Sequence, residues 1–231
     1  MGGPGSSRSN VVNFLYQNTM RRLVLGLLFI SFAVGTPVLR SEVPQAADSM
    51  PFAYGEKLRV MGIPNAGKIT DQLYRGAQPQ AGGLEQLRKI GITTVVDLRG
   101  EGSGVRDLEK KEAEALGIRF VSIPVSGWSP PSIDQVAQFL SLFGKDSRER
   151  VFVHCRLGED RTGVFVATYR MAAQEWPADQ AIKEMYFFGF GFWHRAMVSF
   201  VREFPALLSS SPTLATLSKP KSSVSAVAQP N

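Results

Sequence analysis

Cys155 and Arg161, separated by five residues, are the side chains of this sequence whose types and spacing best suit catalysis. Cys155 is the only cysteine among the 231 residues. Its thiolate form is a strong nucleophile, and the planar guanidinium of an arginine can hold two oxygens of a phosphate group at once. The pair therefore predicts nucleophilic attack on a bound phosphate.

The chain around this pair predicts a strand, a tight loop and a helix. Val151 to Val153 have the character of a short buried strand, and Thr162 to Ala172 have that of a helix. A glycine-containing loop between them can turn its backbone N–H groups inward, as an oxyanion cradle requires. Cys155 would lie at the bottom of this bowl and Arg161 on its rim. The N–H dipoles, the helix N-terminus and the guanidinium all favour the thiolate.

The residues expected to surround the phosphate are Arg156, Leu157, Gly158, Glu159, Asp160 and Arg161. The flanking side chains of His154 and Thr162 are expected to support the thiolate, and Thr162 can donate a hydrogen bond to the sulfur. A buried core thiol is the ordinary alternative for a lone cysteine, and the spacing to Arg161 argues against it. One cysteine and two histidines do not make a four-ligand zinc site without carboxylates. The sequence therefore predicts no metal and no cofactor.

The segment HCRLGEDRTG resembles the HC-x5-R-S/T signature of the cysteine-dependent protein tyrosine and dual-specificity phosphatases. Two further stretches, LYRGAQP (Leu73–Pro79) and TTVVDLRG (Thr93–Gly100), resemble the compact bacterial and plant/fungal dual-specificity-like branch. The resemblance covers about residues 63–205. It implies hydrolysis of phosphate monoesters in two steps, in which Cys155 forms a phosphocysteine that water then hydrolyses.

The resemblance also implies a general acid that protonates the leaving oxygen. In this family the acid is usually an aspartate on a loop about thirty residues before the cysteine, but the corresponding loop, Val125–Ser132, contains no carboxylate. Asp160 is the favoured replacement, because lipid phosphatases with a C-x4-D-R-T pattern have an aspartate there that is a proposed acid. Asp134, just after the loop, and Asp97, at a strand end, are alternatives for which a structural role is the better interpretation. A reaction without a dedicated acid is a further alternative.

The residues give conflicting indications of the substrate. A phenol leaves with little help from an acid, because its pKa is about 10, so the acid-free loop favours protein phosphotyrosine. Arg156 and Asp160 instead fit a phosphoinositide or inositol polyphosphate, although Glu159 and Asp160 disfavour a highly charged ligand. A non-catalytic phosphate-binding module and a rhodanese-type sulfur transferase are further alternatives. The intact Cys155 and Thr162 argue against the module, and Arg161 with its following residues argues against sulfur transfer.

The composition predicts one folded domain with tails. A hydrophobic fraction of 44% is enough for a core. The formal net charge is +6, but residues 1–40 carry four arginines and no acidic residue, which leaves 22 basic and 20 acidic residues, or +2, for residues 41–231. This balance gives no reason to expect nucleic-acid binding. We expect a targeting segment, a linker, a phosphatase-like domain and a disordered tail, over residues 1–40, 41–62, 63–208 and 209–231.

The first of these segments has the layout of an export signal. Arg21 and Arg22 precede the 12-residue apolar run Leu23–Val34, and positive charge before such a run is typical of a secretory signal. Cleavage would follow Gly35. The alternative is an uncleaved anchor that tethers the protein to a membrane through residues 21–39. Its part without charges, Leu23–Leu39, is near the short limit for crossing a bilayer. Either interpretation predicts a periplasmic, extracellular or membrane-anchored protein.

Within the domain, β-branched runs alternate with helical patterns. The expected strands are Lys68–Arg75, Thr93–Leu98, Arg119–Val125 and Val151–Val153. The expected helices are Gly83–Ile90, Arg106–Leu116, Ile133–Phe143, Thr162–Glu175, Asp179–Phe188 and His194–Phe204. The alternation predicts a single α/β domain of the protein tyrosine phosphatase type, with a mainly parallel central sheet and helices on both faces. The phosphate loop would follow the carboxyl end of a strand, where such sheets bind ligands. The aromatic run Tyr186–Trp193 is expected to belong to the core.

Overall fold

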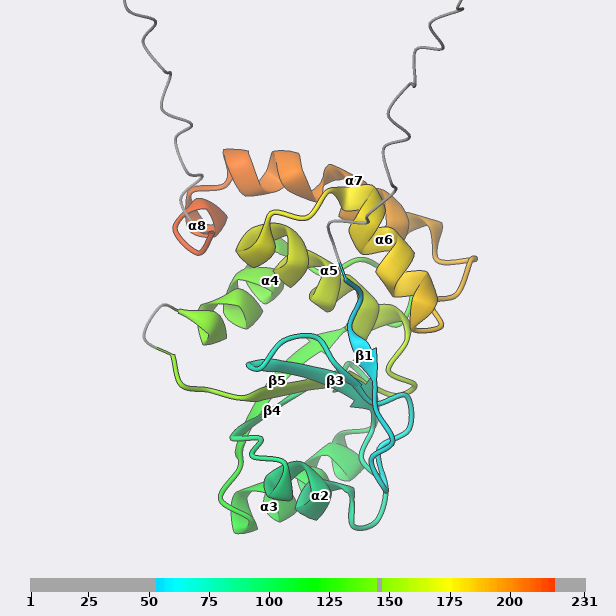
Figure 1. Ribbon diagram of the computed structural model, residues 1–231, viewed down its shortest axis with the longest axis vertical. Helices are drawn as coiled ribbons and strands as arrows, with labels where there is room; N and C mark the ends of the chain where they lie inside the picture. Colours follow the sequence, from blue (N-terminus) through cyan, green and yellow to red (C-terminus); the bar gives the residue numbers. More distant parts are fainter. Residues whose placement is uncertain (1–52, 145–146, 219–231) are drawn as a thin grey trace, which may run out of the picture. The chain divides into compact units, whose positions relative to one another are not determined.

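The computed structural model describes residues 53–144 and 147–218 (Figure 1). The expected targeting segment, most of the expected linker and the end of the expected tail lie outside these residues. In the two ranges that the structure describes, none of the helices has the length and apolar character needed to cross a membrane.

A six-stranded sheet forms the centre of the domain, in the order β1-β2-β3-β6-β4-β5. Its parallel part consists of β3 (Leu73–Ala77), β6 (Val151–Cys155), β4 (Thr94–Arg99) and β5 (Arg119–Val125). At the β3 edge two short strands continue it antiparallel, β2 (Gly67–Lys68) and β1 (Glu56–Lys57). The mainly parallel sheet expected from the sequence is therefore confirmed. Every residue of β3, β4 and β6 is buried, as continuous apolar strands with both faces covered should be.

Helices cover both faces of the sheet (Figure 1). One face carries α2 (Gly83–Lys89) and α3 (Ser103–Ala115). The other carries α4 (Ile133–Leu140), the 3-10 turn η1 (Ser141–Phe143), α5 (Asp160–Gln174), α6 (Ala178–Phe187), α7 (Arg195–Ser210) and α8 (Pro212–Ala215).

Alternate residues of the central strand β6 face the two layers of helices. Val151 and Val153 belong to a buried cluster with Phe165 of α5, and Phe152 belongs to a second cluster with Leu84 of α2. The central strand is thereby fixed from both sides, and so is the loop that follows it. Residues 161–172 of α5 are all buried, so the helix that carries the arginine of the loop is also held rigidly.

The folded domain extends beyond the boundaries expected from the sequence. β1 lies within the segment expected to be a linker, and α7 continues through Pro205 to Ser210. The reason at the carboxyl end is hydrophobic burial, because Leu214 is 0% exposed and Leu207 packs against the same core. The expected first strand, Lys68–Arg75, is also divided between β2 and β3, which pair with each other.

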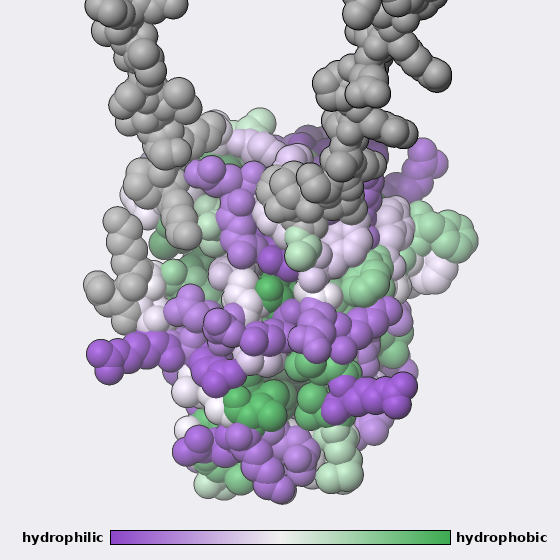
Figure 2. Space-filling view, in the orientation of Figure 1, coloured by the Kyte–Doolittle hydropathy of each residue, from purple (hydrophilic) through white to green (hydrophobic). Residues whose placement is uncertain are grey.

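The aromatic run between α6 and α7 is only partly buried. Phe188 and Phe190 belong to the core, as expected. Phe192 and Trp193, at the tip of this connection, are instead 79% and 57% exposed. Tyr186 and Phe187, at the end of α6, are 45% and 41% exposed, so the expectation fails for these four residues. The connection projects from the domain at the right of Figure 1, and hydrophobic side chains are exposed at the same place in Figure 2.

Candidate active site

Cys155 is the last residue of β6 and lies at the carboxyl edge of the sheet, flanked by β3 and β4. Its thiol is free and only 3% of the residue is exposed. The loop of residues 156–159 follows at once, and α5 begins at Asp160. The strand, loop and helix expected around the cysteine are therefore present.

The loop of residues 156–159 packs directly against the backbone of β3. Gly158 has a φ of +70°, and a Cβ atom added to it would lie 2.3 Å from the carbonyl carbon of Gly76. Only a glycine fits this position, because both the left-handed conformation and the close approach exclude a side chain. The Gly158 carbonyl accepts hydrogen bonds from Nη2 of Arg75 and, at 3.0 Å, from Nδ2 of Asn65. Two side chains thus hold the loop in place from below.

Arg75 brings a buried positive charge beneath the loop. The residue is 1% exposed, and its guanidinium lies 4.2 Å from the ring centroid of Phe188. Burial lowers the pKa of Arg75 to about 10, and the nearby Glu184 and Cys155 partly oppose this shift. The side chain therefore remains charged at neutral pH and favours an anion in the loop above it.

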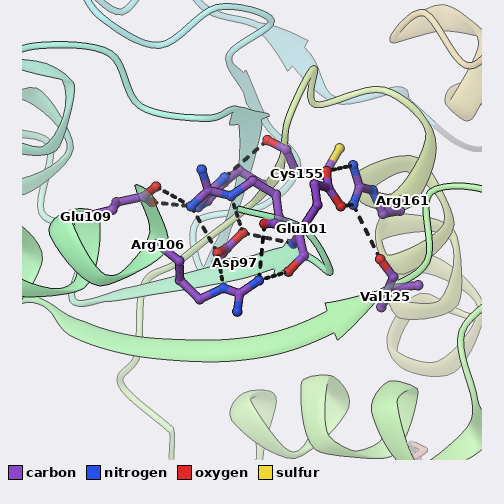
Figure 3. A network of polar contacts seen from close by, with 9 residues as sticks. Asp97, Glu101, Arg106, Glu109, Val125, Cys155 and Arg161 are labelled. Carbon is purple, nitrogen blue, oxygen red and sulfur yellow. Dashed lines mark hydrogen bonds and ion pairs between the residues drawn. The ribbon is translucent and has the colours of Figure 1, made fainter. Parts of the chain in front are cut away.

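Arg161, in the first turn of α5, presents one edge of its guanidinium to the bowl. Nη1 donates to Oε2 of Glu101 at 2.8 Å and to the Val125 carbonyl at 3.4 Å, and Nη2 donates to Oε1 of Glu101 at 2.9 Å (Figure 3). These bonds occupy both hydrogens of Nη1 and one of Nη2. The edge formed by Nε and the second Nη2 hydrogen donates to no oxygen within the described ranges, and this edge can grip a phosphate side-on.

The electrostatic surroundings of Arg161 match this role. Burial alone would lower its pKa, but the bonds to Glu101 and the nearby Cys155 outweigh burial, so the pKa of Arg161 is raised. In return, the ion pair lowers the pKa of Glu101. The guanidinium therefore stays charged beside the sulfur over the whole working pH range.

The backbone of the loop is also available to an anion. In the part of the chain that the structure describes, the N–H groups of residues 156–162 donate to no protein acceptor. Arg156 and Leu157 are exposed, and Glu159 and Asp160 are half-buried. Burial and the neighbouring carboxylate of Asp160 raise the pKa of Glu159.

His154 and Thr162, which flank the loop, were both expected to support the thiolate of Cys155, and their contacts differ. Thr162 is fully buried, but its hydroxyl has no hydrogen-bond partner among the described residues, so its bond to the sulfur stays a prediction. The ring of His154 lies under the nucleophile, with Nδ1 3.2 Å from the Cys155 carbonyl. Its Nε2 is 2.8 Å from Oε1 of Glu109, close enough for an ion pair although the two atoms are not aligned for a hydrogen bond.

A buried ion-pair network continues from Glu109 beneath the loop (Figure 3). Glu109 accepts from Nη2 of Arg99 at 2.6 Å, and Nε of Arg99 donates to Asp97 at 2.8 Å. Arg106 donates to the other oxygen of Asp97 at 3.1 Å. Asp97 is 0% exposed and binds Arg99 and Arg106, so the structural role preferred for it agrees with these contacts.

The other acid candidates lie in different surroundings. Asp134 is exposed in the first turn of α4, where a carboxylate complements the helix dipole. Oδ1 of Asp160 accepts the Gly191 N–H at 2.8 Å, and Oδ2 lies 3.3 Å from Nε2 of His194. Both oxygens of Asp160 are therefore engaged by the connection between α6 and α7.

The model of the family described as "DSP-PTPase phosphatase fused to NAD+ Kinase" matches residues 64–203. The chain belongs to this dual-specificity phosphatase family. It is thus a cysteine-dependent phosphatase, and the bowl around Cys155 is the place where that chemistry can occur.

Named proteins and solved structures are similar to this phosphatase. The dual specificity protein phosphatase TpbA of Pseudomonas aeruginosa (strain UCBPP-PA14) is 29% identical over 170 residues, which cover 74% of this chain and 73% of TpbA. A crystal structure of P. aeruginosa TpbA superposes with a TM-score of 0.58 at 23% identity, covering 73% of this chain and 99% of the other. The catalytic core of the S. cerevisiae phosphatase SIW14 superposes at 0.54 and 18% identity, over 68% and 98% of the chains. These structural likenesses support the fold.

Four residues of this phosphatase site were not found from the sequence: Asn65, Arg75, Glu101 and His194. Arg75 and Glu101 lie in or next to the two stretches that resemble the family, so those stretches carried a signal for them. His194 was noticed only as one of two histidines. Asn65, with a φ of 50°, had no recognisable signal.

Proposed function

We propose that this phosphatase hydrolyses protein phosphotyrosine through a phosphocysteine intermediate. The observation that carries the proposal is the placement of Cys155 below a loop with unused N–H groups, next to the open edge of Arg161. A phosphate held by that edge and those N–H groups has its phosphorus facing the sulfur.

Each step assigns a role to residues of the bowl. The thiolate of Cys155 forms a bond to phosphorus as the bond from phosphorus to the tyrosine oxygen breaks, and the phenol leaves after taking a proton. Water then attacks the phosphocysteine, releasing orthophosphate and restoring the thiolate. Arg161 and the N–H groups of residues 156–161 bind the three phosphate oxygens, and His154 and Thr162 support the sulfur.

The surroundings of the bowl favour an aromatic substrate. Trp128, in the loop without a carboxylate, is 76% exposed, and Trp193 is 57% exposed. Both rings lie close to His194, at centroid distances of 5.3 and 5.9 Å. Exposed aromatic side chains of this kind can stack on a phenyl ring. One solved relative, TpbA with its cysteine replaced by serine, is described in complex with phosphotyrosine.

An inositol phosphate is the alternative substrate, and the description of SIW14 as a PP-IP phosphatase gives it support. The exposed Arg156 would suit such a ligand. The carboxylates of Glu101, Glu159 and Asp160 lie close to the bowl, however, and would repel a ligand with several phosphates. Phosphotyrosine, with a single phosphate, meets less repulsion.

Phosphate release from three substrates tests the proposal. Wild type and Cys155→Ser would be compared on p-nitrophenyl phosphate, a phosphotyrosine peptide and a phosphoinositide. We expect the peptide to have the highest kcat/KM, and the Cys155→Ser variant to be inactive on all three while still binding the peptide. Higher turnover of the phosphoinositide would favour the alternative, and activity in Cys155→Ser would exclude the phosphocysteine.

We further propose that residues 21–39 direct this phosphatase out of the cytoplasm or tether it to a membrane. The support is the order of Arg21, Arg22 and the apolar run Leu23–Val34. Fractionation of cells that produce the full chain, followed by mass determination of the mature protein, tests this. A full-length protein in the cytosolic fraction would contradict it.

A further inference from the structure

His194 lies beside the phosphate loop although it belongs to the distant start of α7. The residue is 7% exposed, and its Nε2 is 3.3 Å from Oδ2 of Asp160. Because Asp160 immediately precedes Arg161, this contact fixes the imidazole at the rim of the bowl. The bond from the Gly191 N–H to Oδ1 of Asp160, at 2.8 Å, ties the same connection to the loop a second time.

The imidazole also adjoins the loop on which the family usually has its acid. The ring of Trp128, in that loop, is 5.3 Å from the ring of His194. At the start of the loop, the Val125 carbonyl accepts from Arg161. His194 therefore lies between the phosphate loop and the loop that lacks a carboxylate.

We propose that His194 is the general acid of this phosphatase and that Asp160 is its positioning residue. The proposal rests on the proposed function. Nε2 faces Asp160, which leaves Nδ1 to face the substrate. Nδ1 makes no hydrogen bond within the described ranges and is not among the fully buried atoms that lack a partner, so it keeps some contact with solvent.

The proton transfers balance in both steps. As the bond between phosphorus and the tyrosine oxygen breaks, Nδ1–H of the imidazolium gives its proton to that oxygen, and His194 becomes neutral. In the second step the neutral imidazole takes a proton from the attacking water as the bond between sulfur and phosphorus breaks. The imidazolium and the thiolate are then restored, with no further reactant than water.

The contacts of the aspartates explain why the histidine has this role. Both oxygens of Asp160 are held by the α6–α7 connection, which suits a carboxylate that orients an imidazole. Asp97 is buried against two arginines. Asp134 is exposed in the first turn of α4 and makes no hydrogen bond or ion pair in the described part of the chain.

The test exploits the acidity of the leaving group, because p-nitrophenol is a better leaving group than tyrosine and needs less protonation. The comparison uses kcat/KM, which reports the steps up to departure of the leaving group and not the later hydrolysis of the phosphocysteine. We expect His194→Gln to lower kcat/KM on the phosphotyrosine peptide by about 10²-fold or more, the usual contribution of a general acid. On p-nitrophenyl phosphate the loss should be at least about tenfold smaller. Phe192→Leu, a change in the same exposed connection, serves as the control and should leave both rates within about twofold.

Two further measurements separate proton transfer from a structural role. The inhibition constant of orthovanadate should stay within about twofold in His194→Gln, since the bowl itself is unchanged. Asp160→Asn should show the same dependence on the leaving group with a smaller loss. The double variant should be no slower than His194→Gln, because residues that act as a unit are not additive.

Each other outcome overturns the inference. An equal loss on both substrates would make His194 a structural cap of α7, and no loss would remove it from the reaction. A large loss in Asp160→Asn beside an active His194→Gln would make the aspartate the acid. Failure of the proposed function is recognised separately, because wild type would then not turn over the peptide, or Cys155→Ser would remain active.

Discussion

Glu101 meets Arg161 end-on, with both carboxylate oxygens bonded at 2.8 and 2.9 Å to the two terminal nitrogens of the guanidinium. This geometry fixes the plane of the guanidinium and turns its remaining edge toward Cys155. Glu101 is 54% exposed at its side chain, yet it is held by the one arginine that the chemistry needs. The arginine that we propose to bind the phosphate is thus positioned before the substrate arrives.

Replacing Glu101 by glutamine should weaken phosphate binding more than it slows the chemical step. Glutamine keeps one acceptor oxygen but loses the charge and the second bond, so the guanidinium can rotate away from its binding orientation. We expect KM for the phosphotyrosine peptide and the inhibition constant of phosphate to rise about tenfold, equivalent to roughly 1.4 kcal/mol. Steady-state kinetics measures both quantities.

Glu114→Gln provides the matched control, because within the described ranges the side chain of Glu114 makes only an exposed contact of 3.8 Å with Lys110. Exposed pairs of this kind contribute little, so its kinetic constants should be those of wild type. A lower KM in Glu101→Gln would show instead that Glu101 competes with the substrate phosphate for Arg161.

Gly158→Ala should inactivate the enzyme by pushing the loop away from β3. The added methyl group would lie 2.3 Å from the backbone of Gly76, and a backbone cannot yield as a flexible side chain can. Because a misplacement of about 1 Å in a site can cost about 10²-fold in rate, we expect kcat/KM to fall by that much or more. Peptide turnover measures the effect.

Gly117→Ala separates this steric effect from the cost of a positive φ. Gly117 has the same φ of +70°, but no atom lies within 4 Å of the added Cβ. Gly117→Ala should lower the free energy of unfolding by about 1 kcal/mol and leave kcat/KM unchanged. Full activity in Gly158→Ala would mean that the loop does not depend on its contact with β3.

The sequence predicted those parts of the site that are close together along the chain. Cys155, Arg161 and the loop between them were found because five residues fix their separation. β4 was found because its β-branched residues are consecutive, and β6 because Val151 to Val153 form a short apolar run. Glu101 reaches Arg161 across 60 positions, and Arg75 and Asn65 reach Gly158 across 83 and 93. Contacts of this kind depend on the order of the strands, which the local pattern does not specify.

Arg75→Met should reduce activity while leaving the fold nearly as stable. Methionine fills a similar apolar space, and Nε and Nη1 of Arg75 have no hydrogen-bond partner among the described residues, so the variant loses little hydrogen bonding. The Gly158 carbonyl would lose one of its two donors, and the bowl would lose a positive charge from below. We expect kcat/KM to fall about 10- to 100-fold, with a melting temperature within a few degrees of wild type.

Arg88→Met is the control for this change, because Arg88 is an exposed arginine on α2 that donates only to the Leu116 carbonyl. Kinetic constants and thermal melts of wild type, Arg75→Met and Arg88→Met show whether Arg75 positions the loop or supports folding. Wild-type kcat/KM in Arg75→Met would leave Arg75 with no role in positioning the loop. Loss of the cooperative melt would show that its role is in folding.

Asp97→Asn should destabilise the protein in a manner that depends on pH. Burial alone would raise the pKa of Asp97, but its bonds to Arg99 outweigh burial, and the pKa lies below its ordinary value of 3.8. A group with a depressed pKa stabilises the folded state above its unfolded-state pKa, and this contribution is lost as the pH falls through the folded-state pKa. At pH 7 the loss of a buried ion-pair partner should cost roughly 3–5 kcal/mol.

Urea unfolding of wild type and Asp97→Asn at pH 7, 5 and 3 would measure this difference. It should be the same at pH 7 and 5 and shrink at pH 3, because unfolded wild type then binds a proton at Asp97 that the folded protein does not, which lowers the stability of wild type toward that of the variant. Asp107→Asn, at an exposed position of α3, should match wild type at every pH. A difference that already shrinks between pH 7 and 5 would place the titration on another group, since a carboxylate paired with two arginines gains its proton only in more acidic solution.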